Sequence, residues 1–204
     1  MEEAPRLLAL LLLAVPLIAG CGETAGPPGA DRRAGTPVLP MTDGVVRYEP
    51  IGVFHTDFTP ETGAPRQSLL RPETRATIEI YEPYRAALET LAEFEYIWVL
   101  YHFDRVETWE PTVRPPGSHH EFGLFATRIP KRPCPIGLSL IKLERIEDGT
   151  LFLSGIDTFE GTPVLDIKPY LPSVDSVKSE INEAVEVELG HHDEDFIEDP
   201  SLFR

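Results

Sequence analysis

Cysteine is scarce in this chain, since only Cys21 and Cys134 occur among its 204 residues. Two cysteines cannot build the disulfide framework of a small secreted domain, and they do not form the paired spacing of a zinc knuckle. Positive charge is also scarce, with 18 Lys and Arg against 34 Asp and Glu and a formal net charge of -16. Because such a protein repels phosphate groups on average, nucleic-acid binding would have to be carried by a local positive patch.

The sequence also lacks the short motifs that mark common catalytic sites. It contains no glycine-rich dinucleotide fingerprint, no P-loop, no nucleophile elbow and no HExxH pattern. Adjacent histidines occur at His119-His120 and at His191-His192, but neither pair has a partner at metal-ligand spacing, so no metal is expected. From composition and motifs alone, the chain is a small β-rich domain with charged segments.

The N-terminal stretch has two interpretations. Residues Leu7–Ala19 form an apolar run that is short for a bilayer span and that Pro16 interrupts. The run leads into Cys21 through a sequence that resembles a bacterial lipoprotein processing box, although the leader before it is more acidic than basic. Either residues 1–40 are a signal-like segment and linker with a lipid anchor at Cys21, or Met41 is the true start of a cytoplasmic protein. The function argued below favours Met41; in both cases residues 1–40 stay outside the fold, and only a genuine Cys21 anchor would bring the protein to a membrane.

Short strands and turns dominate the rest of the chain. The 21 prolines and 15 glycines argue against a helical bundle, and a hydrophobic content of 42% is enough for a packed core. The turn signal Asp148-Gly149 between two apolar runs predicts a β-hairpin. Strands are expected at Val45–Phe54, Arg75–Tyr81, Phe94–Phe103, Gly137–Ile146, Thr150–Ile156 and Pro163–Ile167, short helices at Pro83–Ala92 and Ser173–Leu189, and a long loop at Arg105–His120. The pattern predicts a mostly β (α+β) fold, a small antiparallel barrel with one or two short helices.

The expected barrel domain covers residues 45–172, and residues 173–204 follow it as a C-terminal tail. Between Glu180 and Asp199 this tail has nine acidic residues and no Lys or Arg. Such a charge run is typical of a solvated segment rather than of a core element.

Two proline-rich segments near the middle of the chain carry concentrated charge. The first contains the basic residues Arg128, Lys131 and Arg132, and the second contains Asp157, Glu160, Asp166, Lys168 and Tyr170. Proline fixes φ and disfavours helix at the residue before it, so both segments are expected to be stiff and extended. Charged side chains that are held in place in this way indicate a binding site.

Five motifs occur in order along the chain: Ala64-Pro-Arg-Gln67, Val113-Arg-Pro-Pro116, Phe125-Ala-Thr-Arg128, Arg132-Pro-Cys-Pro-Ile-Gly137 and Gly161-Thr-Pro-Val-Leu-Asp-Ile-Lys-Pro-Tyr170. Together they resemble the TsaA-like family, which includes the TrmO-type tRNA methyltransferases. The resemblance runs from about Tyr48 to Pro172, and the lack of an extra C-terminal segment is similar to the short, archaeal-like form. Three positions depart from the family pattern: Cys134 replaces asparagine, Glu160 replaces aspartate and Asp104 replaces histidine.

The resemblance implies a β-barrel that binds S-adenosylmethionine, usually as a homodimer, and methylates N6 of threonylcarbamoyladenosine next to the anticodon of tRNA. Two alternatives stay open. The barrel could be the binding module of an exported lipoprotein, or the chain could methylate a small non-RNA substrate, which an acidic surface would tolerate better.

The resemblance also implies the site residues. Cofactor contacts are expected at Pro65, Arg66, Gln67, Asp104, Arg105, Arg128, Leu138, Ser154, Gly155, Ile156 and Asp157. An arginine suits the cofactor's carboxylate because its planar fork binds in a bidentate manner. Asp166 is the candidate base with Lys168 or Tyr170 as a stabilising group, and Arg114, Lys131 and Arg132 are candidate tRNA contacts.

Overall fold

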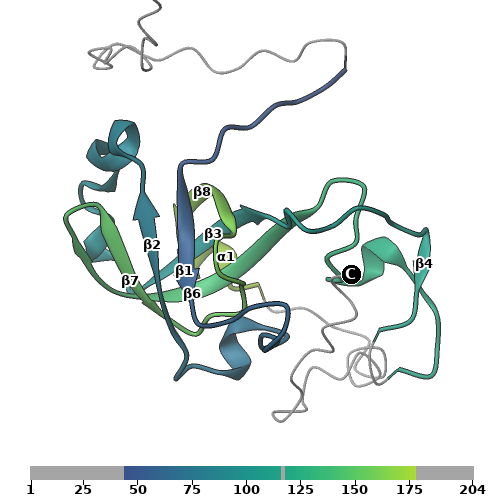
Figure 1. Ribbon diagram of the computed structural model, residues 1–204. Helices are drawn as coiled ribbons and strands as arrows, with labels where there is room; N and C mark the ends of the chain where they lie inside the picture. Colours follow the sequence, from purple (N-terminus) through teal and green to yellow (C-terminus); the bar gives the residue numbers. More distant parts are fainter. Residues whose placement is uncertain (1–43, 116–117, 178–204) are drawn as a thin grey trace, which may run out of the picture. The chain divides into compact units, whose positions relative to one another are not determined.

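The computed structural model describes residues 44–115 and 118–177, and within them six antiparallel strands close into a barrel (Figure 1). The strand order around the barrel is β1-β2-β7-β6-β3-β8. The strands are β1 (Gly52–Thr56), β2 (Arg75–Ile80), β3 (Tyr96–His102), β6 (Ile136–Glu147), β7 (Thr150–Ser154) and β8 (Pro163–Pro169), and a separate two-stranded sheet pairs β4 (Thr112–Val113) with β5 (Phe122–Gly123). The predicted small antiparallel barrel is therefore confirmed.

The core is formed by alternate residues of the barrel strands. On β3 the side chains of Ile97, Val99 and Tyr101 point inward and are buried, whereas Trp98 and Leu100 point outward and are half-buried. The sequence of β3 is apolar on both faces, and the outward positions follow from the two-residue period of a strand. The barrel thus has a closed apolar interior and an additional apolar surface outside β3.

The hairpin predicted at Asp148-Gly149 is confirmed. It joins β6 to β7, and both turn residues have positive φ, 48° at Asp148 and 81° at Gly149. Positive φ at both central positions defines the tight turn that matches the twist of paired strands, and glycine adopts it without steric hindrance.

Several predicted element boundaries are wrong. The first strand begins at Gly52 rather than at Val45, because backbone pairing with β8 starts only after Pro50, where Ile51 N–H donates to Val164 O. The helix expected at Pro83–Ala92 is divided into the 3-10 helices η2 (Glu82–Leu88) and η3 (Leu91–Glu93), since Thr90 between them has the left-handed φ of 66°. The loop expected at Arg105–His120 contains β4.

The predicted helix from Ser173 is short within the described residues. Helix α1 covers Pro172–Asp175 and ends where Ser176 becomes extended. The rest of that predicted helix, the acidic tail from residue 178, and the signal-like segment with Cys21 lie outside the described residues. No helix in the described part of the chain is long and apolar enough to cross a membrane.

Gly137 gives the barrel interior room for the ring of Tyr101. The two residues are cross-strand partners on β6 and β3, and a Cβ atom built on Gly137 would lie 2.1 Å from Tyr101 Cε2. A glycine is therefore required at this position if the ring is to lie across β6 and reach Ser139, whose Oγ is 3.1 Å from the Tyr101 hydroxyl.

We expect Gly137→Ala to destabilise the fold by about 1–3 kcal/mol, the usual effect of overpacking a well-packed core. Urea denaturation measures this change directly. Gly123→Ala is the matched control, because a Cβ there meets nothing within 4 Å and the residue has an ordinary φ of -57°. Equal stability of the two variants would contradict the close approach of Tyr101.

Candidate cofactor and substrate site

The carboxylate of Asp157 is the centre of the candidate site. Its Oδ1 accepts a hydrogen bond of 2.7 Å from Ser139 Oγ on the inner face of β6, and its Oδ2 accepts one of 3.0 Å from the backbone N–H of Ser68. Ser68 opens the 3-10 helix η1 (Ser68–Leu70), and its own hydroxyl donates to Leu140 O at 2.8 Å. One carboxylate thus joins the loop after β7 to β6 and to η1.

Burial raises the pKa of Asp157 to about 6, although the hydrogen bonds from Ser139 and Ser68 and the charge of Arg128 act in the opposite direction. Desolvation disfavours a charged carboxyl, whereas donors and a nearby cation favour it. The group therefore changes its ionisation just below neutral pH.

Three segments that are distant in the sequence meet beside this carboxylate. Arg128 Nη1 donates to Gln67 Oε1 at 2.7 Å, and Gln67 Nε2 donates to Arg66 O at 2.7 Å. Gly155 lies against η1, since a Cβ atom on it would be 3.1 Å from Ser68 O. The structure thus brings together Gln67, Arg128, Gly155 and Asp157, all of which were predicted as cofactor contacts.

A groove of about 260 Å³ adjoins this cluster on the outer side of β6. Ser154 and Gly155 line it together with Leu69, Leu140, Lys142 and Glu144. Ser154 Oγ donates to Glu144 Oε1 at 2.6 Å, and this hydrogen bond is the main cause of the lowered pKa of Glu144. Lys142 and Glu144 were not predicted as site residues, although the alternation of β6 places both of them outward, on the same side as Leu138.

Two of the other predicted contacts are buried. Pro65 is buried, and Ile156 has no exposed surface because its side chain belongs to the core. The backbone of Ile156 is also occupied, since its N–H donates to Thr74 Oγ1 at 2.6 Å and its carbonyl accepts from the same hydroxyl at 3.2 Å. Leu138, in contrast, exposes 51% of its surface next to Ser139.

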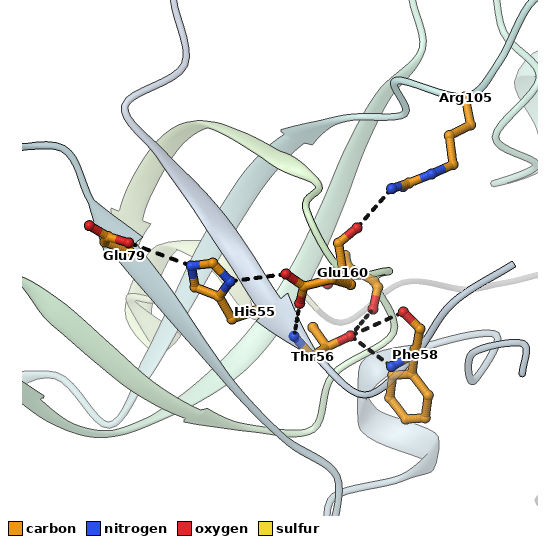
Figure 2. Close-up of polar contacts among 7 residues, drawn as sticks. His55, Thr56, Phe58, Glu79, Arg105 and Glu160 are labelled. Carbon is orange, nitrogen blue, oxygen red and sulfur yellow. Dashed lines mark hydrogen bonds and ion pairs between the residues drawn. The ribbon is translucent and has the colours of Figure 1, made fainter.

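Asp104 and Arg105 belong to a second polar cluster, and Figure 2 shows Arg105 with its partner Glu160. Arg105 Nη1 donates to Asp104 Oδ1 at 3.1 Å, and its Nη2 donates to Glu160 O at 2.7 Å. The carboxylate of Glu160 accepts a hydrogen bond of 2.7 Å from Thr56 N–H and lies 3.0 Å from His55 Nδ1. A crevice of about 20 Å³, which Asp104, Arg105 and Asp157 all line, adjoins both clusters.

Sequence reasoning did not predict that His55 would join this second cluster. Its Nε2 also lies 3.6 Å from Glu79 Oε2, so two carboxylates flank the imidazole. Partial burial alone would raise the pKa of Glu160, but hydrogen bonds from Thr56 and His55 and the charges of His55 and Arg105 lower it. A single histidine on a short strand has no motif around it, and only the fold reveals its partners, Glu79 on the neighbouring strand β2 and Glu160 in the loop before β8.

The predicted catalytic residues lie on the outer side of the barrel. Lys168 Nζ is 2.6 Å from Asp166 Oδ2, and the ring of Tyr170 packs edge-on against Trp98 at 6.0 Å between centroids. On β3, Leu100 pairs with Asp166 of β8 on one side and with Leu138 of β6 on the other. Asp166 and Leu138 are thus separated by one strand, roughly 10 Å in a β-sheet.

The predicted tRNA contacts lie in or beside the segment after β4. Arg132 Nη1 donates to the carbonyls of Thr127 at 2.9 Å and Ile129 at 3.3 Å, so this guanidinium also holds the local backbone. Arg114 is exposed, 4.0 Å from Glu121, and Lys131 is half-buried.

The closed antiparallel barrel agrees with the TsaA-like fold that the motifs indicated, and the comparisons with known proteins confirm that family. The model of the tRNA-methyltransferase O N-terminal domain matches residues 53–176. The chain belongs to this family.

Relatives and solved structures support the assignment. The chain is 45% identical over 134 residues to a putative S-adenosylmethionine-dependent methyltransferase RcsF of Pseudomonas aeruginosa, covering 63% of this chain and 58% of that protein. It is 37% identical over 141 residues to the tRNA (adenine(37)-N6)-methyltransferase of Escherichia coli K12, and the match covers 64% of this chain and 60% of that protein. A crystal structure of TrmO from Pseudomonas aeruginosa superposes with a TM-score of 0.56 at 40% identity and covers 68% of this chain and 62% of that one. The chain thus spans about three fifths of the length of these proteins.

The raised pKa of Asp157 predicts a pH-dependent contribution to stability. Because the folded protein holds this proton more tightly than the unfolded chain, the contribution is fully present below the ordinary value of 3.8 and is lost as the pH rises through about 6. Asp157→Asn cannot titrate. We expect the wild-type free energy of unfolding, relative to that of the variant, to fall between about pH 4 and about pH 7. Urea denaturation at a series of pH values measures this difference, and a constant value would contradict the buried carboxyl.

Proposed function

We propose that this chain binds S-adenosylmethionine and methylates N6 of an adenine in tRNA, with threonylcarbamoyladenosine beside the anticodon as the substrate. The observation that carries the proposal is the meeting of Gln67, Arg128 and Asp157 at one polar site on a barrel of the tRNA-methyltransferase O family. The names of relatives support the cofactor and the tRNA substrate. We assign the function to the expected barrel domain, residues 45–172, and to the cytoplasm, where tRNA is available.

The residues of the cluster fit the chemical groups of the proposed cofactor. Arg128 is exposed and offers a guanidinium for a carboxylate, while the carboxylate of Asp157 has capacity for a hydroxyl or for a neighbouring positive charge. Leu138 and Leu140 offer apolar surface to a purine ring on the outer side of β6. When bound, the cofactor supplies a methyl group on a sulfonium, and this group is transferred in line with the attacking nitrogen.

The chain's own part in the transfer is alignment and proton removal. The N–CH₃ bond forms while the S–CH₃ bond breaks, and the nitrogen gives up one proton. We propose that Asp166 accepts this proton and that Lys168, 2.6 Å away, or Tyr170 stabilises the charge that develops. Holding both reactants in line contributes most of the rate enhancement, since the chemistry itself is a simple displacement.

We also propose that the protein forms a homodimer through the outer face of β3 and β6. This apolar face includes Ile136 of β6 with Trp98 and Leu100 of β3, and it adjoins Leu138 and Leu140, which we assign to the purine ring. Chains that each carry a net charge of -16 repel one another, so a contact between two copies requires an apolar surface of this kind. A second copy on this face would also cover the space between Leu138 and Asp166.

The test of the proposed function uses purified protein, S-adenosylmethionine and tRNA with and without the threonylcarbamoyl group. We expect methyl transfer only to the threonylcarbamoylated tRNA. Transfer to a free nucleoside but not to tRNA would favour the small-substrate alternative. A mature N-terminus at lipidated Cys21, together with no cofactor binding, would favour the exported binding module and contradict our proposal.

Arg128→Ala should weaken S-adenosylmethionine binding by at least about tenfold, because a charge-assisted hydrogen bond contributes about 1.5–3 kcal/mol. Isothermal titration calorimetry measures the dissociation constant. Arg114→Ala is the control, since it removes an equal charge from an exposed arginine that makes no contact with Gln67. Unchanged affinity in Arg128→Ala, or an equal loss in both variants, would contradict the site.

Ile136→Glu should convert the dimer into a monomer, because it buries a charge in the proposed interface. Sedimentation velocity shows the change, and Val46→Glu, at an exposed position before β1, should leave the dimer intact. A wild-type protein that is monomeric at all accessible concentrations would overturn the proposed homodimer.

A further inference from the structure

Phe125 is an exposed aromatic residue on a rigid support. It exposes 79% of its surface, while the preceding Leu124 and, two residues further on, Thr127 are buried. A phenyl ring that stays in water does not make the large contribution to the free energy of folding that a buried aromatic side chain makes. Such a ring on an ordered backbone indicates a contact with another molecule.

The backbone around Phe125 is held from both sides. The ring belongs to the 3-10 helix η4 (Leu124–Ala126), whose first N–H donates to Pro111 O at 3.0 Å. Thr127 Oγ1 donates to Leu124 O at 2.8 Å, and Arg132 Nη1 donates to Thr127 O at 2.9 Å. These bonds fix the turn that presents the ring, so the exposure follows from a defined conformation. A preorganised ring loses little entropy when a partner binds.

The segment that carries Phe125 is basic in a strongly acidic protein. From Phe122 to Pro135 the chain has three basic residues, Arg128, Lys131 and Arg132, and no Asp or Glu. The guanidinium carbon of Arg132 lies 5.6 Å from the centroid of the Phe125 ring. An aromatic ring beside an arginine in a basic segment is the combination with which proteins stack unpaired nucleobases while attracting the backbone phosphates.

We propose that Phe125 stacks on an unpaired base of the RNA loop that carries the methylated adenine. This inference rests on the proposed function and adds a base-binding residue to it. Arg128, three residues further along the chain, belongs to the candidate cofactor site through its bond to Gln67. A base held on Phe125 would therefore lie next to the bound cofactor. An apolar protein partner does not account for the three basic residues of this segment, and the negative charge of RNA does.

The experiment compares wild-type protein with Phe125→Ala, Phe125→Trp and the control Tyr48→Ala, which removes an aromatic ring that is 65% exposed. The probe is a fluorescein-labelled tRNA anticodon stem-loop, and fluorescence polarisation gives its dissociation constant without requiring catalysis. We expect Phe125→Ala to weaken binding about fivefold to a hundredfold, Phe125→Trp to restore it, and Tyr48→Ala to leave it unchanged. A fully paired RNA hairpin stem should be bound equally by all four proteins.

The outcomes that overturn the inference are distinct from failure of the proposed function. Equal binding of the stem-loop by wild type and Phe125→Ala, or no binding by wild type, would overturn it. A shift of Phe125→Ala from dimer to monomer in sedimentation velocity would also overturn it, because the ring would then be covered by a second copy. Loss of stem-loop binding in Phe125→Ala with unchanged affinity for S-adenosylmethionine supports stacking, whether or not methyl transfer is observed.

Discussion

The carboxylate of Asp157 is the interaction on which the site depends. It accepts hydrogen bonds from Ser139 on β6 and from the backbone of Ser68 on η1, and these groups come from segments 18 and 89 residues away. Its partial burial would be unfavourable without those donors. The carboxylate therefore fixes the position of the loop after β7 relative to the loop that carries Gln67. That arrangement places Gln67, which precedes Ser68, and Gly155 beside the carboxylate.

The same network explains why position 137, inside the barrel, requires a glycine. The hydroxyl of Tyr101 lies 3.1 Å from Ser139 Oγ, and its ring can occupy that position only because residue 137 has no side chain. The core and the site are thus connected through one serine: its hydroxyl touches an inward tyrosine on one side and the site carboxylate on the other. A change in the packing of β3 against β6 that moves Ser139 would therefore alter its hydrogen bond to Asp157.

The fold could be predicted from the sequence because its signals are local. The strand expected at Arg75–Tyr81 and the Asp148-Gly149 turn each depend on a few consecutive residues, and both were confirmed. The boundaries were less predictable. The first strand and the split helix near Thr90 depend on which backbone groups find partners in the closed barrel, and no short stretch of sequence contains that information.

The sequence suggested members of the candidate site but not their grouping. The resemblance of the motifs suggested Gln67, Arg128 and Asp157, yet only the closed barrel shows that they meet, while Asp104 and Arg105 gather instead around Glu160. The cluster around His55 had no sequence signal, because Glu79 on β2 and Glu160 in the loop before β8 come beside it only on folding. The exposure of Phe125 was equally hidden, since an apolar residue in a basic segment gives no indication of which way its ring points.

The central claim is that the Asp157-centred cluster is where S-adenosylmethionine binds. The most direct test follows backbone amide resonances of the protein by NMR while S-adenosylmethionine is added. The account predicts the largest shifts at Ser68, whose N–H donates to Asp157, and at Gln67 and Arg128 beside it. Shifts confined to the cluster around His55 and Glu160, or no shifts at saturating cofactor, would contradict it.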